Sequence, residues 1–323
     1  MLNKKTILIT GSAGFIGFHL SKLFVKKGWT VIGLDGMTKY YDLKLKKDRH
    51  KILSKFDNFK KKEFLISNIN KLTELFLKYS PSFVVHLAAQ AGVRYSLEEP
   101  KEYLNNNIIS TFNILEMCKI YKVKHLLISS TSSVYGNNDT QPFKELDKTD
   151  NPLSFYAATK KSCEVLSHSY SHCFKIPITL FRFFTVYGPW GRPDMAYFKF
   201  VKNIMENKQI EIYGHGKMYR DFTYIDDIVE GIKLVIFNQD IESGEIFNIG
   251  NGKQVELMKF IDRIGIELNR EPKVNLVPPH PADVLETWSN TNKLQKLGYQ
   301  PMVDIEEGVA HFMEWYKDYM EVN

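Results

Sequence analysis

The sequence predicts an α/β protein: a Rossmann-type, doubly wound parallel sheet followed by a smaller mixed α/β C-terminal domain. Three observations lead to this fold class. Short β-branched and apolar runs alternate with helical patterns as far as residue 184. A glycine-rich segment lies between the first such run and the first helical pattern. The alternation stops after residue 188, where glycine and proline cluster. Strands that alternate with helices are typical of a parallel sheet covered on both faces.

The expected strands are apolar runs without helical spacing, at residues 6–10, 30–35, 63–66, 83–89, 125–130 and 178–184. Between them, apolar residues recur three and four positions apart, as on one face of a helix. This spacing predicts helices at residues 15–27, 71–79, 102–121 and 157–174, and Gly28 ends the first of them. Further on we expect a helix at 196–207, strands at 210–213 and 245–249, and an amphipathic helix over about the last 20 residues.

The change of pattern divides the chain into two predicted domains. The segment Gly-Pro-Trp-Gly-Arg-Pro at 188–193 cannot form regular structure and marks the change. Residues 1–178 are expected to bind a dinucleotide, and residues 221–247 are expected to return to this domain. Residues 179–220 and 248–323 are expected to form the substrate-binding domain.

The composition narrows the possible partners. Lysine and arginine number 43 against 37 aspartates and glutamates, so the net charge of +6 is mild for 323 residues. It suits an anionic small molecule and gives no support for nucleic-acid binding, which needs basic charge concentrated on one face. The densest basic run, residues 44–51, is interpreted as the solvated face of a helix.

The chain lacks the sequence marks of membranes, secretion and metal sites. No apolar run approaches the about 20 residues that span a bilayer, and no signal peptide is expected. The three cysteines form no CxxC pair, and the nine histidines show no HxH or HExxH spacing. We therefore expect a cytoplasmic protein that has no metal ion and does not contact a membrane.

The glycine-rich segment predicts a dinucleotide site. Gly11, Gly14 and Gly17 lie between a strand and a helix, where glycines let the backbone approach a pyrophosphate and the helix N-terminus offers N–H groups. An acidic residue is then expected about 20 residues later, at the end of the second strand. Asp35 is there. Its carboxylate would accept ribose hydroxyls and repel a 2′-phosphate, which favours NAD over NADP.

A tyrosine and a lysine form the second motif. In Tyr156-Ala-Ala-Thr-Lys160 the two residues share one helix face, where an ammonium would lower the pKa of the phenol and make it a general base toward a sugar hydroxyl. The spacing alone is common in helices. The hydroxyl cluster at 129–133 raises its significance, because it ends a strand where ligands of open α/β sheets bind.

The third motif follows the strand at 178–184. Arg192 could hold a carboxylate through its planar guanidinium, and Thr185 could add a hydroxyl. From these residues alone, a structural loop with an exposed arginine is an equally good interpretation.

Together these residues resemble the extended short-chain dehydrogenase/reductase family over essentially the whole chain. Four stretches resemble, more narrowly, the UDP-glucuronate 4-epimerases: residues 86–96, 156–161, 182–196 and 220–227. The third stretch is long and specific, and it favours a binding role for Arg192 over the structural loop.

The resemblance implies roles for individual residues. Tyr156 and Lys160 would be the base and its activator, and Thr131 would complete the catalytic set. NAD would be held by Gly11, Gly14, Phe15, Ile16, Gly17, Asp35, Asn68, Ala88, Asn107, Tyr156 and Lys160. The UDP-sugar would be held by Arg94, Ser132, Ser133, Thr185, Arg192, Ile212, Tyr213, Arg220 and Asp283. Thr185 and Arg192 would take the sugar carboxylate.

The sequence departs from the family pattern at three places. Family members commonly have Gly-Asp after the third strand, where the acid meets the adenine, and this chain has Ser67-Asn68. An amide oxygen can still accept, so we expect NAD binding with altered contacts. Near Asp283 the family usually has a Gln or Arg followed by Pro-Gly-Asp, and this chain has His280-Pro-Ala-Asp. Gly36 stands where the family usually has Asn.

The reaction that the resemblance implies is the NAD-dependent epimerisation of UDP-glucuronate to UDP-galacturonate at carbon 4, through a 4-keto intermediate. NAD would stay tightly bound and be regenerated in each cycle, and the family expectation is a homodimer. The alternatives are a UDP-glucuronate decarboxylase, a nucleotide-sugar 4,6-dehydratase, a 4-epimerase of UDP-glucose or UDP-N-acetylglucosamine, and a non-catalytic NAD-binding sensor. Decarboxylases and dehydratases use an acidic residue where this chain has Ser132 and Ser133. UDP-glucose and UDP-N-acetylglucosamine 4-epimerases tend to carry Asn at the position of Thr185.

Overall fold

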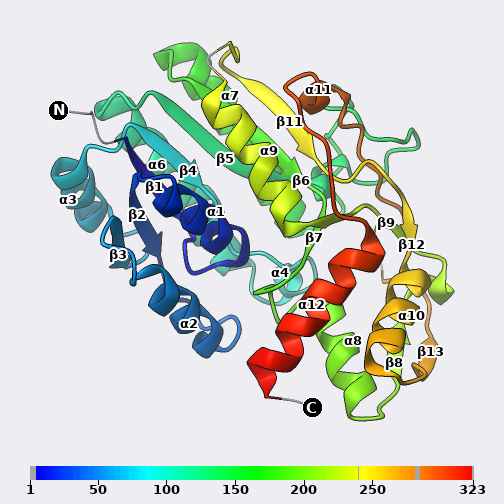
Figure 1. The fold of residues 1–323 in the computed structure, drawn as a ribbon. Coiled ribbons are helices and arrows are strands. Elements are labelled where there is room, and N and C mark those ends of the chain that lie inside the picture. The colour runs from blue at the N-terminus through cyan, green and yellow to red at the C-terminus, as the bar shows by residue number, and fades with distance from the viewer. Residues whose placement is uncertain (1–4, 239, 281–283, 322–323) are drawn as a thin grey trace.

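The protein is described by a computed structural model that covers residues 5–238, 240–280 and 284–321. Its centre is a sheet of seven strands in the order β11-β6-β5-β4-β1-β2-β3, and every neighbouring pair is parallel (Figure 1). The order reverses between β1 and β4, and ligands of such sheets bind at the carboxyl ends of the strands beside this point. The strands are β1 (Thr6–Thr10), β2 (Thr30–Asp35), β3 (Phe59–Glu63), β4 (Phe83–His86), β5 (His125–Thr131), β6 (Ile178–Phe183) and β11 (Glu245–Ile249).

Helices cover both faces of this sheet because successive side chains of each strand point to opposite sides. Ile7 and Ile9 of β1 pack in one hydrophobic cluster, with the helices α1 (Phe15–Lys26) and α9 (Ile225–Phe237). Leu8 packs in a second cluster, with α3 (Ile69–Tyr79), α6 (Ser110–Ile120) and part of α7 (Phe155–Phe174). The predicted doubly wound α/β fold is therefore confirmed.

A smaller region lies beside the carboxyl ends of the strands. It contains α8 (Ala196–Met205), α10 (Leu257–Leu268) and α12 (Ile305–Met320), which group together at one end of the molecule (Figure 1). Short strand pairs complete it: β7 (Thr185–Tyr187) with β10 (Phe222–Tyr224), β8 (Ile210–Ile212) with β13 (Val274–Leu276), and β9 (Tyr219–Arg220) with β12 (Val255–Glu256). Its core residues Phe198, Phe260 and Phe312 belong to the same hydrophobic cluster as Ile7 and Ile9.

The expected domain boundaries stay predictions. Helix α9 and strand β11 lie with the central sheet, although the chain reaches them from the smaller region. Strand β6 also belongs to the central sheet, beyond the expected boundary at residue 178. Short helices complete the described chain: α2 (Leu43–Leu53), α4 (Tyr95–Glu98), α5 (Pro100–Tyr103) and α11 (Asn292–Gln295), with 3-10 turns at Ser132–Tyr135 and Gly214–Gly216.

One prediction about the elements was wrong, and two were right only in part. The third strand is Phe59–Glu63 and not 63–66; it is an edge strand whose lysines face solvent, so it lacks an apolar run. The long helix expected at 102–121 begins as α5 and passes through a π-helical turn, Leu104–Ile109, before α6. The basic run at 44–51 lies on α2, where Lys44, Lys47 and Lys51 are exposed as expected, but Lys46, Arg49 and His50 are buried.

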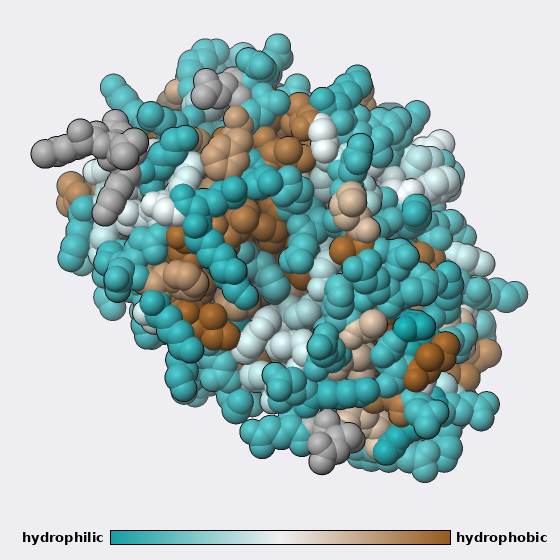
Figure 2. Space-filling model, viewed as in Figure 1, coloured by the Kyte–Doolittle hydropathy of each residue, from teal (hydrophilic) through white to brown (hydrophobic). Residues whose placement is uncertain are grey.

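The surface gives no sign of a membrane span. Most of the face in Figure 2 is hydrophilic, and its hydrophobic side chains lie in small separate patches. Among the described residues, none of the helices combines the length and the apolar character that crossing a bilayer requires.

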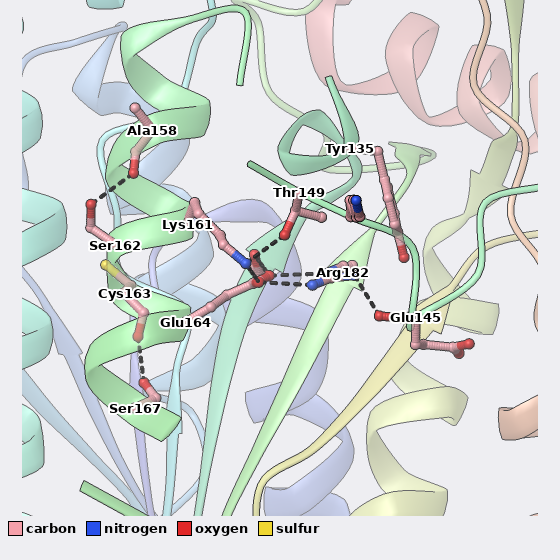
Figure 3. A network of polar contacts seen from close by, with 12 residues as sticks. Tyr135, Glu145, Thr149, Ala158, Lys161, Ser162, Cys163, Glu164, Ser167 and Arg182 are labelled. Atoms are coloured by element: carbon pink, nitrogen blue, oxygen red, sulfur yellow. Dashed lines mark hydrogen bonds and ion pairs between the residues drawn. The ribbon is translucent and has the colours of Figure 1, made fainter. Parts of the chain in front are cut away.

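A buried ion pair fastens α7 to the sheet. Glu164 accepts from Nε and Nη2 of Arg182 on β6, at 2.9 Å each (Figure 3). It also accepts from the hydroxyl of Ser130 on β5 at 2.6 Å. Arg182 also donates to the carbonyl oxygen of Glu145 at 3.0 Å, and its guanidinium lies 4.8 Å from the ring centre of Tyr135. Both charged side chains are almost fully buried, so each depends on the other to offset its lost hydration.

We expect Glu164→Leu to lower the free energy of unfolding by about 3–5 kcal/mol, because Arg182 is left as an unpaired buried charge. The double variant Glu164→Leu/Arg182→Met should regain most of this loss, since an apolar pair of similar volume needs no partner. Urea denaturation followed by circular dichroism measures both. Glu206→Leu, which breaks the exposed pair with Lys208, is the control and should change little. Equal instability of the single and double variants would contradict the interpretation.

Candidate active site

The glycine-rich loop forms a cradle that side chains would fill. Gly11 has φ +71°, and a Cβ there would lie 2.9 Å from the main-chain N of Ala88 at the end of β4. A Cβ at Gly14 would lie 2.9 Å from the carbonyl oxygen of Gly11, and a Cβ at Gly17 only 2.1 Å from it. Helix α1 begins at Phe15, so its unpaired N–H groups face the same space. This close backbone and positive helix end suit a pyrophosphate.

Asp35 lies where an NAD ribose would be recognised. It ends β2, and its carboxylate accepts from the main-chain N–H of Ala13 at 3.1 Å and of Met37 at 2.8 Å. The carboxylate lines the same cavity as Gly11, Gly14 and Gly17, and carboxylate oxygens have further lone pairs to accept from hydroxyls. The residues present therefore fit NAD.

Two residues that the resemblance assigned to NAD lie outside the cavity lining. Asn68 is exposed, and its side chain accepts from the N–H of Lys71 and caps α3. Asn107 is buried; its side chain binds both main-chain groups of Gln90, at 2.7 and 3.1 Å, and donates to the Thr159 hydroxyl at 2.9 Å. Asn107 thus fixes the loop after β4 against α7 as a support.

A cavity of about 1260 Å³ joins this cradle to the expected sugar site. The described residues lining it include all the other predicted site residues: Phe15, Ile16, Ala88, Arg94, Thr131, Ser132, Ser133, Tyr156, Lys160, Thr185, Arg192, Ile212, Tyr213 and Arg220. Asp283 lies outside the described residues. Among the described residues, the His, Cys, Asp and Glu side chains form no group that could hold a metal ion.

Tyr156 and Lys160 reach the cavity from the first two turns of α7. Ser154 caps this helix by accepting from the N–H of Ala157 at 3.1 Å. Lys160 Nζ donates to the Ser129 hydroxyl at 3.4 Å, at the carboxyl end of β5. The hydroxyl oxygens of Thr131, the last residue of β5, and Ser133 lie 3.1 Å apart. Base, ammonium and hydroxyls therefore meet at one edge of the sheet.

Burial dominates the electrostatics of this group. It raises the pKa of Tyr156, while the charge of Arg192 and a hydrogen bond from Thr131 act in the opposite direction. Burial also lowers the pKa of Lys160, against the nearby Cys163 and Glu164, which raise it. The predicted fall in the pKa of Tyr156 through Lys160 is therefore not what the structure shows, because loss of hydration outweighs the favourable neighbours.

Arg192 lies in the cavity and is not an exposed loop residue. Its Nε and Nη2 donate to the two carboxylate oxygens of Asp194, at 3.1 and 2.5 Å. Burial acts to lower the pKa of Arg192, but Asp194 and the tyrosines Tyr40 and Tyr41 together raise it above its usual range. One edge of the guanidinium is thus taken by Asp194, and its remaining N–H groups are available to a second acceptor.

Tyr213 and Arg220 bound the part of the cavity that is expected to hold the UDP. The guanidinium of Arg94 lies over the ring of Tyr213, 3.9 Å from its centre. Arg220 donates to the carbonyl oxygens of Tyr219 and Leu285, at 2.8 and 2.7 Å, which fixes its position at the rim.

Sequence reasoning missed four residues of this region: Tyr40, Tyr41, Arg49 and Asp194. The first three follow β2, and Arg49 lies in the basic run 44–51 that was interpreted as a solvated helix face. The signal for Asp194 was the spacing Arg-Pro-Asp, which lets a carboxylate turn back to the arginine two residues earlier.

A family model described as "NAD dependent epimerase/dehydratase family" matches residues 7–250. The chain belongs to this family. It is 46% identical to a probable UDP-glucuronate 4-epimerase of Rhizobium meliloti (strain 1021), with 96% of each chain covered. The crystal structure of UDP-glucuronic acid 4-epimerase from Bacillus cereus, in complex with UDP-glucuronic acid and NAD, is 35% identical with a TM-score of 0.93, covering 97% of this chain and 99% of that one. A UDP-glucose 4-epimerase of Thermotoga maritima with UDP-glucose is 28% identical with a TM-score of 0.88, covering 98% and 99%.

Thr131→Val should move the acid limb of the pH–activity profile to higher pH. A tyrosine acts as a base only after losing its proton, so activity rises with pH through the pKa of Tyr156. The Thr131 hydrogen bond lowers that pKa, and removing it should raise the limb by roughly half to one pH unit, the worth of one hydrogen bond. The pH dependence of kcat/KM measures the limb. The control is Ser162→Ala. Ser162 lies on α7 like Tyr156, but its hydroxyl donates to the carbonyl oxygen of Ala158 and not to the phenol. If the acid limb lies at the same pH in Thr131→Val, Ser162→Ala and the unchanged protein, Thr131 does not lower the pKa of the catalytic base.

Proposed function

We propose that the protein is a UDP-glucuronate 4-epimerase that uses NAD. The observation that carries this proposal is the placement of Tyr156 and Lys160, beside Thr131, in one cavity with Arg192. A base for a sugar hydroxyl and a cation for a sugar carboxylate then face the same space. Support also comes from the relatives that are named UDP-glucuronate 4-epimerases and from the related structure that holds UDP-glucuronic acid and NAD.

The proton chemistry falls to Tyr156. Its phenolate removes the proton of the sugar 4-hydroxyl, and the phenol so formed later returns a proton to the same oxygen. The charge of Arg192 and a hydrogen bond from Thr131 favour the phenolate against the effect of burial, and Lys160 would add to this when it carries its proton. Thr131 donates to the oxygen on which negative charge develops, and this hydrogen bond is strongest when the oxygen is charged. NAD, when bound, accepts the hydride of carbon 4 and gives it back. The 4-keto sugar must turn over in the cavity between the two transfers, so that the hydride returns to its other face.

The carboxylate of this substrate creates a hazard. A 4-keto-glucuronate is a β-keto acid, and it loses carbon dioxide when its carboxylate bond stands perpendicular to the ketone plane. Thr185 and Arg192 would hold the carboxylate away from that orientation. Asp194 keeps the arginine fork fixed by occupying one of its edges. Because Arg192 is already paired on that edge, only its other N–H groups would meet the sugar.

The serines beside Thr131 argue against the alternatives that need an acid. Ser132 and Ser133 line the cavity at the positions where the resemblance places the acid of decarboxylases and dehydratases, and serine hydroxyls do not supply a proton at neutral pH. The cationic Arg192 favours a uronic acid over UDP-glucose or UDP-N-acetylglucosamine. A non-catalytic NAD sensor would have no use for Tyr156 and Lys160 together.

Purified protein incubated with UDP-glucuronate, and with no added NAD, should form UDP-galacturonate until the two reach equilibrium. Deuterium placed on carbon 4 should remain in the product, because the hydride leaves and returns within the site. Tyr156→Phe should lose roughly 10²–10⁴-fold in turnover, since a general base is removed, while retaining its NAD. Chromatography and mass spectrometry resolve the sugars. A UDP-pentose as the main product, or loss of the deuterium to water, would contradict the proposal.

We also propose that the enzyme works in the cytoplasm as a homodimer and supplies polysaccharide precursors. All three cysteines are unpaired, which suits a reducing compartment. The helices α6 and α7 pack on each other and expose apolar side chains, with Phe112 42% and Val165 56% accessible. Ile109, one turn before Phe112, is 45% accessible and extends this face. Covering such a face with a second copy removes apolar area from water.

Phe112→Asp should convert the dimer to a monomer of 37.6 kDa, because a carboxylate at the centre of an apolar interface loses its hydration without a partner. Sedimentation velocity measures the mass. Leu146→Asp changes a 98% accessible leucine elsewhere on the surface and should leave the dimer intact. The unchanged protein sedimenting as a monomer would contradict the proposal.

A further inference from the structure

Arg49 on α2 is fully buried, and its partners are main-chain oxygens from two distant loops. Nη1 donates to the carbonyl oxygen of Ala13 at 2.7 Å and to the hydroxyl of Tyr41 at 3.1 Å. Nη2 donates to the carbonyl oxygens of Trp190 at 2.5 Å and Gly191 at 2.8 Å. One planar group therefore ties residue 13 to residues 190 and 191, which the fork of an arginine can do because its N–H groups point in fixed directions.

The two loops that Arg49 joins belong to the two halves of the cavity. Ala13 lies within the glycine-rich loop, and its N–H donates to Asp35. Trp190 and Gly191 directly precede Arg192, which faces the sugar end. The main chain from which Arg192 projects is thus attached to the cradle for NAD through the side chain of Arg49.

Helix α1 supports the same loop without reaching the position of Arg192. His19 lies 2.9 Å from the carbonyl oxygen of Pro189 through Nε2, which donates because a carbonyl only accepts. Burial lowers the pKa of His19 to about 3, so the ring is neutral. The rings of Phe18 and Trp190 lie 5.5 Å apart. These contacts hold the start of the loop, and Arg49 holds the part next to Arg192.

We infer that Arg49 is a positioning residue for recognition of the sugar carboxylate: it sets the place of Arg192 relative to the NAD cradle and so determines the preference for a uronic acid. The inference rests on the proposed function in one respect, the role of Arg192. Removing the guanidinium leaves the carbonyl oxygens of residues 13, 190 and 191 buried without donors, so the loop must shift to find new partners. The contacts that fix Tyr213 and Arg220, with Arg94 and with the carbonyl oxygens of Tyr219 and Leu285, do not involve Arg49, so we expect the proposed UDP-binding end to keep its geometry.

The test compares two ligands that differ only in the carboxylate. Affinities of the full chain for UDP-glucuronate and for UDP-glucose, each with saturating NAD, are measured by titration calorimetry, and their ratio is the uronate preference. Arg49→Met, which keeps the length and removes every donor, should lower this ratio about tenfold, the effect of one charge-assisted hydrogen bond. Arg49→Lys, which keeps a charge but cannot reach both loops at once, should give an intermediate ratio.

The matched control is Arg270→Met. Arg270 also donates to main-chain carbonyl oxygens, those of Ile204 and Met205, but these belong to neither the glycine-rich loop nor the segment next to Arg192, so the ratio should stay unchanged. Circular dichroism checks the folding of each variant, and Arg49→Lys decides if Arg49→Met does not fold. A ratio within twofold of the unchanged protein, or equal losses of affinity for both ligands, would overturn the inference.

Failure of the proposed function is distinguishable from failure of this inference. An unchanged protein that prefers UDP-glucuronate but does not epimerise it rejects the proposed reaction, and the ratio still decides the role of Arg49. An unchanged protein with no preference for UDP-glucuronate rejects the carboxylate role of Arg192 and overturns this inference as well.

Discussion

The buried pair of Glu164 and Arg182 is the interaction on which the site geometry depends. Glu164 lies one turn beyond Lys160 on α7, and the Ser130 that it binds directly precedes Thr131 on β5. Arg182 lies near the end of β6, just before Thr185. One carboxylate therefore fixes the helix of the base against the two strands that deliver the other reacting side chains. A shift of this pair would displace α7, β5 and β6 relative to one another. Catalysis requires the side chains that they carry to stay in place within fractions of an ångström.

The same burial that orders the site opposes the charges it needs. Tyr156 and Lys160 are both driven toward their neutral forms, and the phenolate and ammonium exist only through specific neighbours. Arg192 is different, because its ion pair with Asp194 stabilises the protonated guanidinium in a poorly hydrated cavity. The site therefore combines groups whose protonation can change with a cation whose protonation is fixed, which separates proton transfer from substrate recognition.

Short sequence patterns predicted the features that depend on neighbouring residues in the chain. The glycine-rich loop, Asp35, and the Tyr156–Lys160 spacing follow from strand, turn and helix geometry, and each was found where expected. Strand β3 was misplaced because an edge strand rich in lysine has no apolar run. The burial of Arg49 depends on carbonyl oxygens more than a hundred positions away, so no window around it carries the signal. Asn68 was expected at the cofactor by analogy, and the helix it caps uses its side chain instead.

The hydrophobic cluster that runs from β1 into the smaller region limits how the cavity can open. Ile7 on the sheet and Tyr316 on the last helix belong to one continuous apolar core. Swinging the two regions apart as rigid bodies would wet that core, at a cost in free energy that grows with every square ångström exposed. The sugar nucleotide must therefore enter and leave through local motions of the loops that border the cavity. Turnover in this enzyme should be governed by loop kinetics, with the bulk of the scaffold remaining stationary.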